Sequence, residues 1–260
     1  MLTLKQIKQH YNEKEQKLGR ALLREYLQYQ ILDLIFSSFL GDKLVFTGGT
    51  AIRIVYGSDR FSEDLDFDVT GLNEQMFERF TQYLKRELKK RGLVSEYRNV
   101  HKGVYRCYLR FPNLLYDYKL SDQITEKILI QLDVAEKRKL PPVRMHLLNE
   151  FDVFKEIRTY PQEVLAIKKF EALLGRKRPK GRDIYDIVYL FSRISAEDLD
   201  FSVMESSYEV KSLQDLKGAL KGFVERVNLK DLARDVEPFL IDPKKISRVL
   251  LFDRFVEELE

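Results

Sequence analysis

The most informative stretch of the sequence is Lys43–Thr50, KLVFTGGT, and the other predicted elements are interpreted in relation to it. Leu44–Phe46 is a short apolar run, which predicts a buried strand. Two glycines interrupt the run, and the spacing of Ala51, Ile54 and Val55 then predicts a helix. Glycines at a strand-to-helix turn let the backbone approach a ligand closely, and the N–H groups of a helix N-terminus suit a phosphate.

A second stretch, Phe61–Asp68 (FSEDLDFD), alternates between apolar and acidic side chains. A period of two predicts a strand that turns its apolar residues to one face and its acidic residues to the other. Three carboxylates on one face, Asp64, Asp66 and Asp68, repel one another unless solvent or cations surround them. Carboxylates together with substrate phosphates commonly hold Mg²⁺, so the pattern favours a two-ion Mg²⁺ site for phosphoryl transfer, in which Mn²⁺ could substitute.

The order of strand, Gly-Gly-Thr, helix and acidic strand resembles the signature of the DNA polymerase β-like nucleotidyltransferases. Residues 46–51 (FTGGTA) and 60–67 (RFSEDLDF) look more specifically like the AbiEii/AbiGii toxin family, the toxin arm of type IV toxin–antitoxin systems. The resemblance implies an α+β fold. We expect a polymerase β-like nucleotidyltransferase core, with a mixed sheet flanked by helices, followed by a C-terminal helical domain.

A further carboxylate, Asp133, lies near the end of a strongly predicted strand, Lys127–Val134. A buried carboxylate is costly without a partner. The family places a third metal-binding carboxylate on a later strand, so the resemblance implies that Asp133 joins Asp64 and Asp66 as metal ligand and catalytic residue. The alternative is that Asp133 has only reached the edge of the sheet. The nucleotide is expected to contact four residues near the glycine turn and the acidic strand: Gly48, Gly49, Thr50 and Ser62.

Two basic segments follow the predicted strands. The helix predicted from Pro161 carries Lys168 and Lys169 side by side, and periodicity does not separate them. The family's Ala-x-Lys segment maps to Lys168, which implies a catalytic lysine that meets nucleotide phosphates; a surface lysine is the alternative. On residue type alone, Asp183 could cap the next helix and Arg182 could belong to a solvated basic loop. The family's Arg-Asp-hydrophobic-x-Asp pattern instead implies a substrate-binding segment: Arg182, Asp183 and Asp186.

The domain boundary is predicted where strands give way to helices. Residues 1–160 are expected to form the nucleotidyltransferase core with its N-terminal helices. Residues 161–260 are expected to form a helical domain that contributes the catalytic lysine and the Arg182–Asp186 segment. Pro141 and Pro142 are predicted to end the strand-rich part of the core, because proline interrupts regular elements.

Composition narrows the class of protein further. No apolar run among the 260 residues approaches the length of a membrane span, and Cys107, the single cysteine, rules out an intramolecular disulfide. The three widely spaced histidines argue against a histidine-based zinc site. A net charge of +4 permits a nucleic-acid partner without requiring one. We expect a cytoplasmic monomer that makes no contact with membranes.

The resemblance implies an enzyme that moves NMP from an NTP to an acceptor hydroxyl. RNA is the expected acceptor, with the tRNA 3′ end as the best-known case, and the expected role is that of a toxin with a cognate antitoxin in abortive infection. Protein and small-molecule acceptors stay open, as does a housekeeping or resistance role. The alternative from another class is a catalytically inactive module of the same fold that binds nucleotides or RNA. The intact acidic set argues against that alternative.

Overall fold

The computed structural model describes residues 1–204 and 208–259, and the chain divides into two compact units. Unit 1 comprises residues 1–51 and 61–159, and unit 2 comprises residues 52–60 and 160–260. Residues 52–60 therefore group with the C-terminal part of the chain, although they lie between the glycine turn and the acidic strand in sequence. No helix in the described part of the chain is long and apolar enough to cross a membrane.

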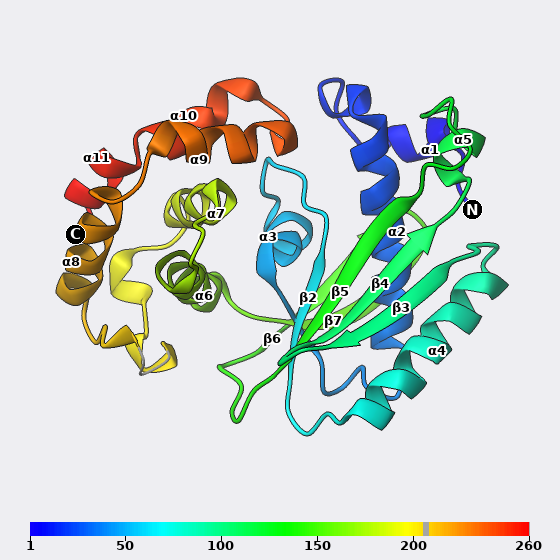
Figure 1. The fold of residues 1–260 in the computed structure, drawn as a ribbon, viewed down its shortest axis with the longest axis horizontal. Helices are drawn as coiled ribbons and strands as arrows, with labels where there is room; N and C mark the ends of the chain where they lie inside the picture. Colours follow the sequence, from blue (N-terminus) through cyan, green and yellow to red (C-terminus); the bar gives the residue numbers. More distant parts are fainter. Residues whose placement is uncertain (205–207, 260) are drawn as a thin grey trace. The chain divides into compact units, whose positions relative to one another are not determined.

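Unit 1 is built on a seven-stranded sheet with the order β3-β4-β5-β2-β1-β7-β6 (Figure 1). The β2–β5 and β1–β7 pairs are parallel and the other four pairs are antiparallel. The mixed sheet confirms the predicted α+β class. The strands are β1 (Val45–Thr47), β2 (Leu65–Val69), β3 (Glu96–His101), β4 (Tyr105–Phe111), β5 (Ile128–Glu136), β6 (Arg144–Glu150) and β7 (Val153–Thr159).

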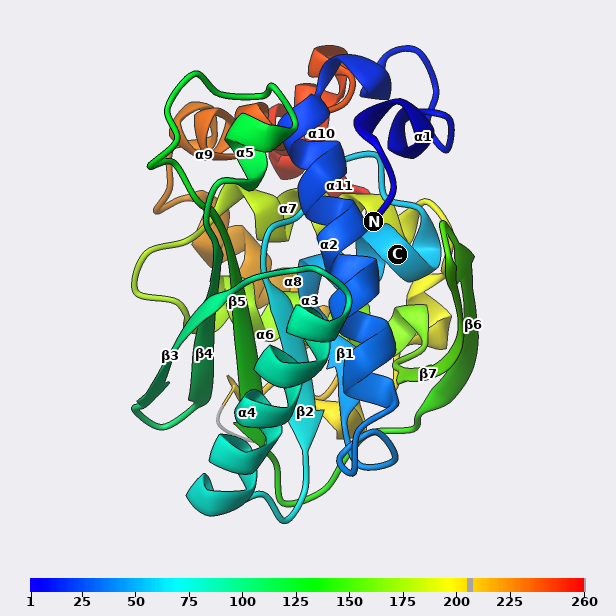
Figure 2. The same cartoon turned by 90° about the vertical axis from the view of Figure 1, so that its right-hand side faces the viewer.

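Two long helices cover one face of this sheet. Figure 2 shows α2 (Gly19–Phe36) and α4 (Glu74–Lys90) side by side in front of the strands. The Phe67 ring of β2 packs on this side, with its centroid 6.1 Å from that of Phe36. The acidic residues of β2 alternate with Phe67, so they face the opposite side of the sheet. The short helices of unit 1 are α1 (Leu4–Lys8), the 3₁₀ turn Glu15–Lys17 and α5 (Leu114–Asp117).

The prediction that Pro141 and Pro142 end the strand-rich part is wrong. The hairpin of β6 and β7 follows the prolines, and β7 joins β1 through the pairing of Phe46 with Thr159. Proline interrupts only its own position, so a new strand can begin two residues later. The Thr159 hydroxyl donates to the Phe46 carbonyl at 2.9 Å, which fixes this parallel contact beside the glycine turn.

Helix α3 (Gly48–Tyr56) begins at the first glycine of the turn, and its part from residue 52 onward belongs to unit 2. The rest of unit 2 is helical. Its longer helices are α6 (Gln162–Gly175), α7 (Gly181–Phe191), α8 (Leu213–Val224) and α9 (Leu229–Val236), and its shorter ones are α10 (Ser247–Leu250) and α11 (Phe252–Glu257). Among the residues that the structure describes, 3₁₀ turns at Ala196–Asp198, Phe201–Val203, Glu237–Phe239 and Pro243–Ile246 lie between these helices.

Candidate functional site

A row of polar side chains crosses four neighbouring strands of unit 1. Thr47 of β1 is paired with Asp66 of β2, Asp66 with Asp133 of β5, and Asp133 with Arg106 of β4. Residues paired across strands project from the same face of a sheet. The fold thus brings two of the three predicted carboxylates, Asp66 and Asp133, to adjacent positions, although 66 residues separate them in the chain.

The glycine turn lies against the Asp66 carboxylate. Gly48 has a φ of +77°, a conformation that side chains other than glycine rarely adopt. A Cβ atom on Gly48 would lie 2.1 Å from Oδ2 of Asp66. The absence of a side chain at this position therefore creates the space that the carboxylate occupies.

Thr50 ties the start of α3 to the acidic strand. Its side chain is fully buried, and its hydroxyl donates a hydrogen bond to the main-chain carbonyl of Asp64. The predicted hydroxyl contact with a phosphate would have to displace this bond. Because the hydroxyl of Thr50 is already bonded, its backbone N–H, in the first turn of the helix, is the donor that remains for a phosphate.

Two residues of α2 that carried no functional prediction hold the segment before β2. The buried amide of Gln28 donates to the main-chain carbonyls of Ser62 and Glu63, at 3.1 and 2.9 Å. One turn earlier, Arg24 pairs with the Glu63 carboxylate at 2.7 Å. These bonds fix the backbone that carries Ser62 and Asp64. The four-residue spacing places Arg24 and Gln28 on one face of the helix, but α2 carries other polar residues as well, so the sequence does not single these two out.

The Asp133 carboxylate is held by Arg106. Nε and Nη2 of Arg106 donate to Oδ1 and Oδ2 of Asp133, both at 2.7 Å. Within residues 1–204 and 208–259, no group of three or more His, Cys, Asp or Glu side chains is arranged to hold a metal ion. The predicted three-carboxylate cluster is therefore not assembled here, since Asp133 has a cation as its partner. The donors that the row does supply are oxygens, the type that Mg²⁺ prefers.

The Thr47 hydroxyl is buried at the end of β1 without a hydrogen-bond partner. The residue is only 5% exposed and lies between Phe46 and Gly48, directly across from Asp66. A buried hydroxyl that forms no hydrogen bond costs free energy.

The two adjacent lysines of α6 have different surroundings inside unit 2. Nζ of Lys168 lies 5.4 Å from the centroid of the Tyr160 ring. Lys169 points into the unit, where Nζ is 3.0 Å from Asp183 and 2.8 Å from Asp186. Burial alone would lower the pKa of Lys169, but the two carboxylates outweigh it and raise the pKa above its usual value. Lys169 is thus part of the interior of unit 2.

The acidic residues predicted to bind substrate are buried in the same ion network. Asp186 accepts hydrogen bonds from Arg60 at 2.7 and 2.5 Å, and both side chains are almost completely buried. Asp183 pairs with Lys169 and with Arg176, at 3.0 and 2.8 Å. Asp183 forms no cap, because the helix begins after Lys180 without a side-chain cap. Within unit 2 these carboxylates join α6, α7 and Arg60, a residue whose role the sequence did not reveal.

Arg182, the other member of the predicted segment, stacks on an aromatic ring. Its guanidinium carbon lies 4.6 Å from the centroid of Phe239. The predicted site residues divide between the two units. Gly48, Thr50, Asp64, Asp66 and Asp133 belong to unit 1, and Lys168, Arg182, Asp183 and Asp186 belong to unit 2.

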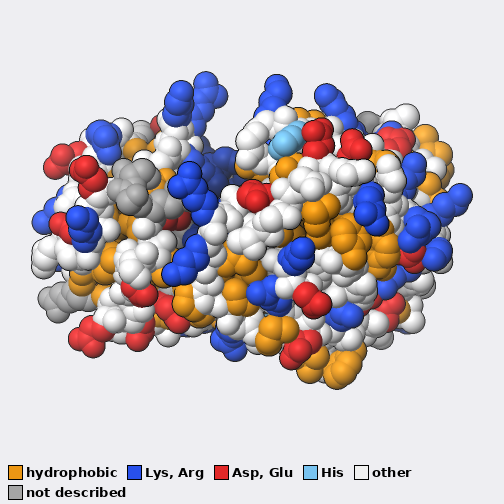
Figure 3. Space-filling view, turned by 90° about the horizontal axis from the view of Figure 1, so that it is seen from below, with side chains coloured by type: hydrophobic (Ala, Val, Ile, Leu, Met, Phe, Trp, Pro, Cys, Tyr) orange, Lys and Arg blue, Asp and Glu red, His pale blue; other side chains and the backbone are white. Residues whose placement is uncertain are grey.

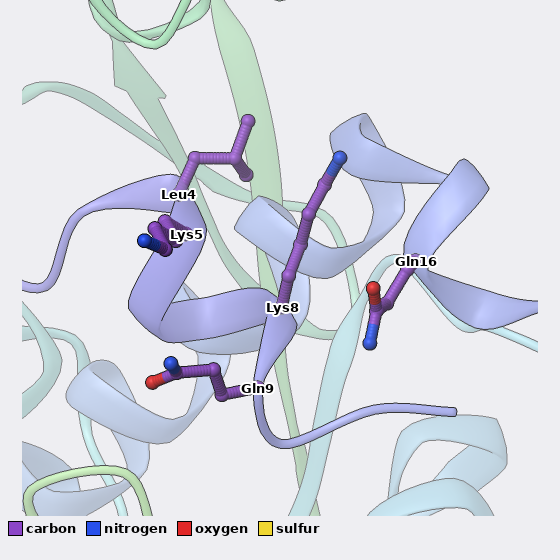
Figure 4. Close-up of a pocket in the computed structure, with 5 residues that line it drawn as sticks. All are labelled: Leu4, Lys5, Lys8, Gln9 and Gln16. Carbon is purple, nitrogen blue, oxygen red and sulfur yellow. The ribbon is translucent and has the colours of Figure 1, made fainter. Parts of the chain in front are cut away.

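An open pocket of about 460 Å³ lies elsewhere in unit 1 (Figure 4). Leu4, Lys5 and Lys8 reach it from α1, and the remaining lining residues are Gln9 and Gln16. None of these residues is a carboxylate or belongs to the glycine turn. The pocket is therefore separate from the row that contains Asp66.

The family to which this chain belongs is one of nucleotidyltransferases. The family model described as "Nucleotidyl transferase AbiEii toxin, Type IV TA system" matches residues 30–247. The chain belongs to this family of nucleotidyltransferase toxins, and membership implies a cognate antitoxin. A comparison with curated proteins found no match.

Solved structures of other proteins share the fold, including the following three. MenT4, a nucleotidyltransferase toxin from Mycobacterium tuberculosis, is 16% identical with a TM-score of 0.59, over 100% of this chain and 91% of that one. JHP933 from Helicobacter pylori is 19% identical with a TM-score of 0.55, over 92% of both chains. A putative nucleotidyltransferase from H. pylori is 19% identical with a TM-score of 0.53, over 92% of this chain and 97% of that one.

Proposed function

We propose that this toxin transfers a nucleoside monophosphate from an NTP to a hydroxyl at the 3′ end of an RNA, with tRNA as the acceptor, in a Mg²⁺-dependent reaction. Family membership supports the transfer chemistry, and the approach of Gly48 to the Asp66 carboxylate is the observation that carries the site assignment. In a cell, a monomeric cytoplasmic enzyme of this kind would disable translation unless its antitoxin is present.

The acidic residues hold the metal in this proposal. Asp64 and Asp66 are the primary ligands. Asp133 becomes a ligand when Arg106 releases it and pairs with another anion. When bound, Mg²⁺ or Mn²⁺ would neutralise phosphate charge and lower the pKa of the attacking hydroxyl.

The turn at the start of α3 binds the triphosphate. Backbone N–H groups of Gly48, Gly49 and Thr50 lie in the first turn of a nine-residue helix, where donors lack intrahelical partners. Ser62 adds a hydroxyl, and Lys168 balances the charge of the departing phosphates. The acceptor oxygen bonds to the α-phosphorus while the bond from that phosphorus to its bridging oxygen breaks. Pyrophosphate leaves, and the hydroxyl proton passes to solvent.

Thr47 supplies a further contact in this scheme. Its buried hydroxyl has no protein partner and faces the same row as Asp66, so it can bond to a phosphate oxygen or to a water molecule beside it. Arg182 and the Asp183–Asp186 turn complete the predicted substrate-binding set. The two carboxylates of that turn act indirectly, because both are buried and ion-paired.

The test is transfer of label from each of the four NTPs into total RNA with Mg²⁺, comparing the native chain with Asp66→Asn and Thr47→Val. Asp66→Asn keeps the size of the side chain and should abolish transfer. Thr47→Val should weaken transfer without lowering stability, since it removes a hydroxyl that the protein does not satisfy. Asp122→Asn, an exposed loop acid, is the matched control.

The outcome separates the open alternatives. Label that appears in RNA and is lost with Asp66→Asn supports the proposal. Label found only in protein or in a small molecule would show that the acceptor is not RNA. Full activity of Asp66→Asn would remove the carboxylate row from the mechanism. Growth arrest on expression, relieved by a co-expressed antitoxin, tests the toxin role of the same variants.

A further inference from the structure

A second group of side chains forms rows beside the carboxylate row, on strands β3, β4 and β5. Arg98 of β3 is paired with Tyr108 of β4, and Tyr108 with Gln131 of β5. In the next row, Arg110 of β4 is paired with Leu129 of β5. Because paired residues share a face, these five side chains project from the same side as Asp133 and Arg106.

This side of the three strands is opposite to helix α4. Asn99 alternates with Arg98 along β3, and its amide donates to the Thr81 hydroxyl of α4 at 2.8 Å. The residues of β4 that alternate with Tyr108, namely Cys107 and Leu109, are fully buried. Arg98 is exposed and Leu129 is 39% exposed, so solvent reaches the side that carries the arginines.

The charged side chains on this side of the sheet include two more cations than anions. Arg106 is paired with Asp133, and Glu96 is paired with Lys127 at 2.8 Å. Arg98 and Arg110 form no salt bridge with any residue that the structure describes. Arg110 is paired across the strands with Glu96, but the Glu96 carboxylate is hydrogen-bonded to Lys127, which lowers its pKa with a smaller contribution from Arg110. A phosphodiester group would supply an anion to Arg98 and a second anion to Arg110, at a distance from the carboxylates set by the strand spacing.

An aromatic ring lies between the arginines. The guanidinium carbon of Arg110 is 5.8 Å from the centroid of the Tyr108 ring, and Tyr108 is partly exposed. Arginine side chains beside an exposed aromatic ring are what proteins use to bind single-stranded nucleic acid, since the ring stacks on a base while the cations bind phosphates.

We propose that Arg98, Tyr108 and Arg110 form an acceptor platform that binds the single-stranded end of the RNA and leads its terminal hydroxyl to Asp66. The platform strands β4 and β3 lie two and three strand spacings from β2, which places them about 10–15 Å from the Asp66 strand. A strand of RNA crossing the sheet along these rows would pass Tyr108 before it reaches the carboxylates. The inference rests on RNA being the acceptor, as proposed above.

Total charge does not identify an RNA-binding surface on this protein, so the local arrangement of side chains has to. On the face drawn in Figure 3, basic, acidic and hydrophobic side chains are interspersed. The outer face of α4 is the competing basic surface, with Lys85 and Lys89 both exposed. Lys89 is also explained by the helix dipole, which favours cations in the last turn, and Nζ of Lys85 lies 5.3 Å from the centroid of the Tyr97 ring.

The first experiment measures binding of a short labelled single-stranded RNA without NTP. Arg98→Ala with Arg110→Ala should weaken binding about tenfold and reduce the salt dependence of log K by about 1.4, the share of two phosphate contacts on a single strand. Lys85→Ala with Lys89→Ala removes the same charge from α4 and should change neither. Tyr108→Leu should weaken binding about tenfold, whereas Tyr108→Phe keeps the ring and should bind normally.

The second experiment measures transfer to RNA by the same variants. The Arg98/Arg110 variant should show a raised KM for RNA with an unchanged kcat, and NTP binding should not change. An unchanged KM, or an equal loss in the α4 variant, would overturn the platform while leaving the transferase proposal intact. Equal competition by double-stranded RNA would also overturn it, because stacking on Tyr108 requires unpaired bases. If the native chain labels only protein, the proposed function fails, and the binding experiment still decides whether the face holds RNA.

Discussion

Arg106 and Asp133 form a two-point ion pair across β4 and β5, with both N–O distances at 2.7 Å. The hydrogen bonds to Asp133 raise the pKa of Arg106 further above its already high value, so the guanidinium is charged at every accessible pH. The carboxylate predicted as the third metal ligand is therefore neutralised by a permanent cation. Metal binding at Asp133 has to compete with this pair.

Replacement of Arg106 by Gln should strengthen metal binding. The pair is partly exposed, with 37% of the Arg106 side chain accessible, so we assign it about 1 kcal/mol, or about a fivefold gain in affinity for Mn²⁺. Calorimetric titration of the nucleotide-free chain measures the gain. Arg98→Gln removes an equal charge that has no carboxylate partner and should leave the affinity near its native value. Equal affinities in all three proteins would show that Asp133 is not a ligand.

Replacement of Gly48 by Ala should inactivate the site through Asp66. The added Cβ would meet the Asp66 carboxylate at 2.1 Å and would also have to adopt a φ of +77°. We expect a loss of about 2–4 kcal/mol in the free energy of unfolding, from backbone strain and displacement together, and no measurable transfer.

Gly71→Ala separates the two effects. Gly71 has a similar φ of +71°, but a Cβ there would have no heavy atom within 4 Å. The control should lose only the strain, about 1–2 kcal/mol, and should keep its activity. Urea unfolding and the NTP transfer assay read out both variants. A Gly48→Ala protein that transfers nucleotide normally would contradict the proposed approach of the turn to Asp66.

The neighbouring lysines of α6 should divide into a functional and a structural residue. Lys169→Ala would leave Asp183 and Asp186 with one cation fewer in a buried network, which predicts a loss of about 3–5 kcal/mol in stability. Lys168→Ala should lower transfer at least tenfold and shift stability by less than about 1 kcal/mol. Thermal unfolding and transfer rates, measured side by side, test the pair. The reverse pattern would move the phosphate contact from Lys168 to Lys169.

The stability of unit 2 should fall in acid through Asp59. Burial alone would raise the pKa of Asp59, but hydrogen bonds from Lys245, Tyr185 and Arg248 outweigh it and lower the pKa from 3.8 to about 2. A carboxylate with a depressed pKa in the folded state adds stability above its unfolded pKa, and that stability is lost as the pH falls toward the folded value.

Asp59→Asn should therefore unfold more easily than the native chain near neutral pH, by about 1–2 kcal/mol after allowance for solvent screening. The difference should stay constant from about pH 7 to about pH 5 and should shrink as the pH is lowered from about 4 to about 2. Urea unfolding across this range measures it, with Asp253→Asn, an exposed acid of α11, as the control. A difference that is constant with pH would show that ionisation of Asp59 adds no stability.

Local patterns in the sequence predicted the elements that carry the site. The apolar run before the glycines became β1, the alternating stretch became β2, and the segments after Asn73 and Pro161 became α4 and α6. Each depends on neighbours within about one helical turn or one strand, so periodicity and helix-start signals are enough to identify them. The β6–β7 hairpin was not predicted. Its apolar residues Met145, Leu147 and Phe154 are exposed, so apolar positions in this hairpin do not mark its buried face.

The sequence by itself determined the glycine turn, the acidic strand and the family, because these are encoded by residues close together in the chain. Only the tertiary structure decided that Arg106 holds Asp133, that Gln28 and Thr50 anchor the acidic segment, and that Lys169 is interior. Those relationships join residues 14 to more than 30 positions apart through strand register and helix packing. Pairing across strands is fixed by the whole sheet, and no local pattern specifies it.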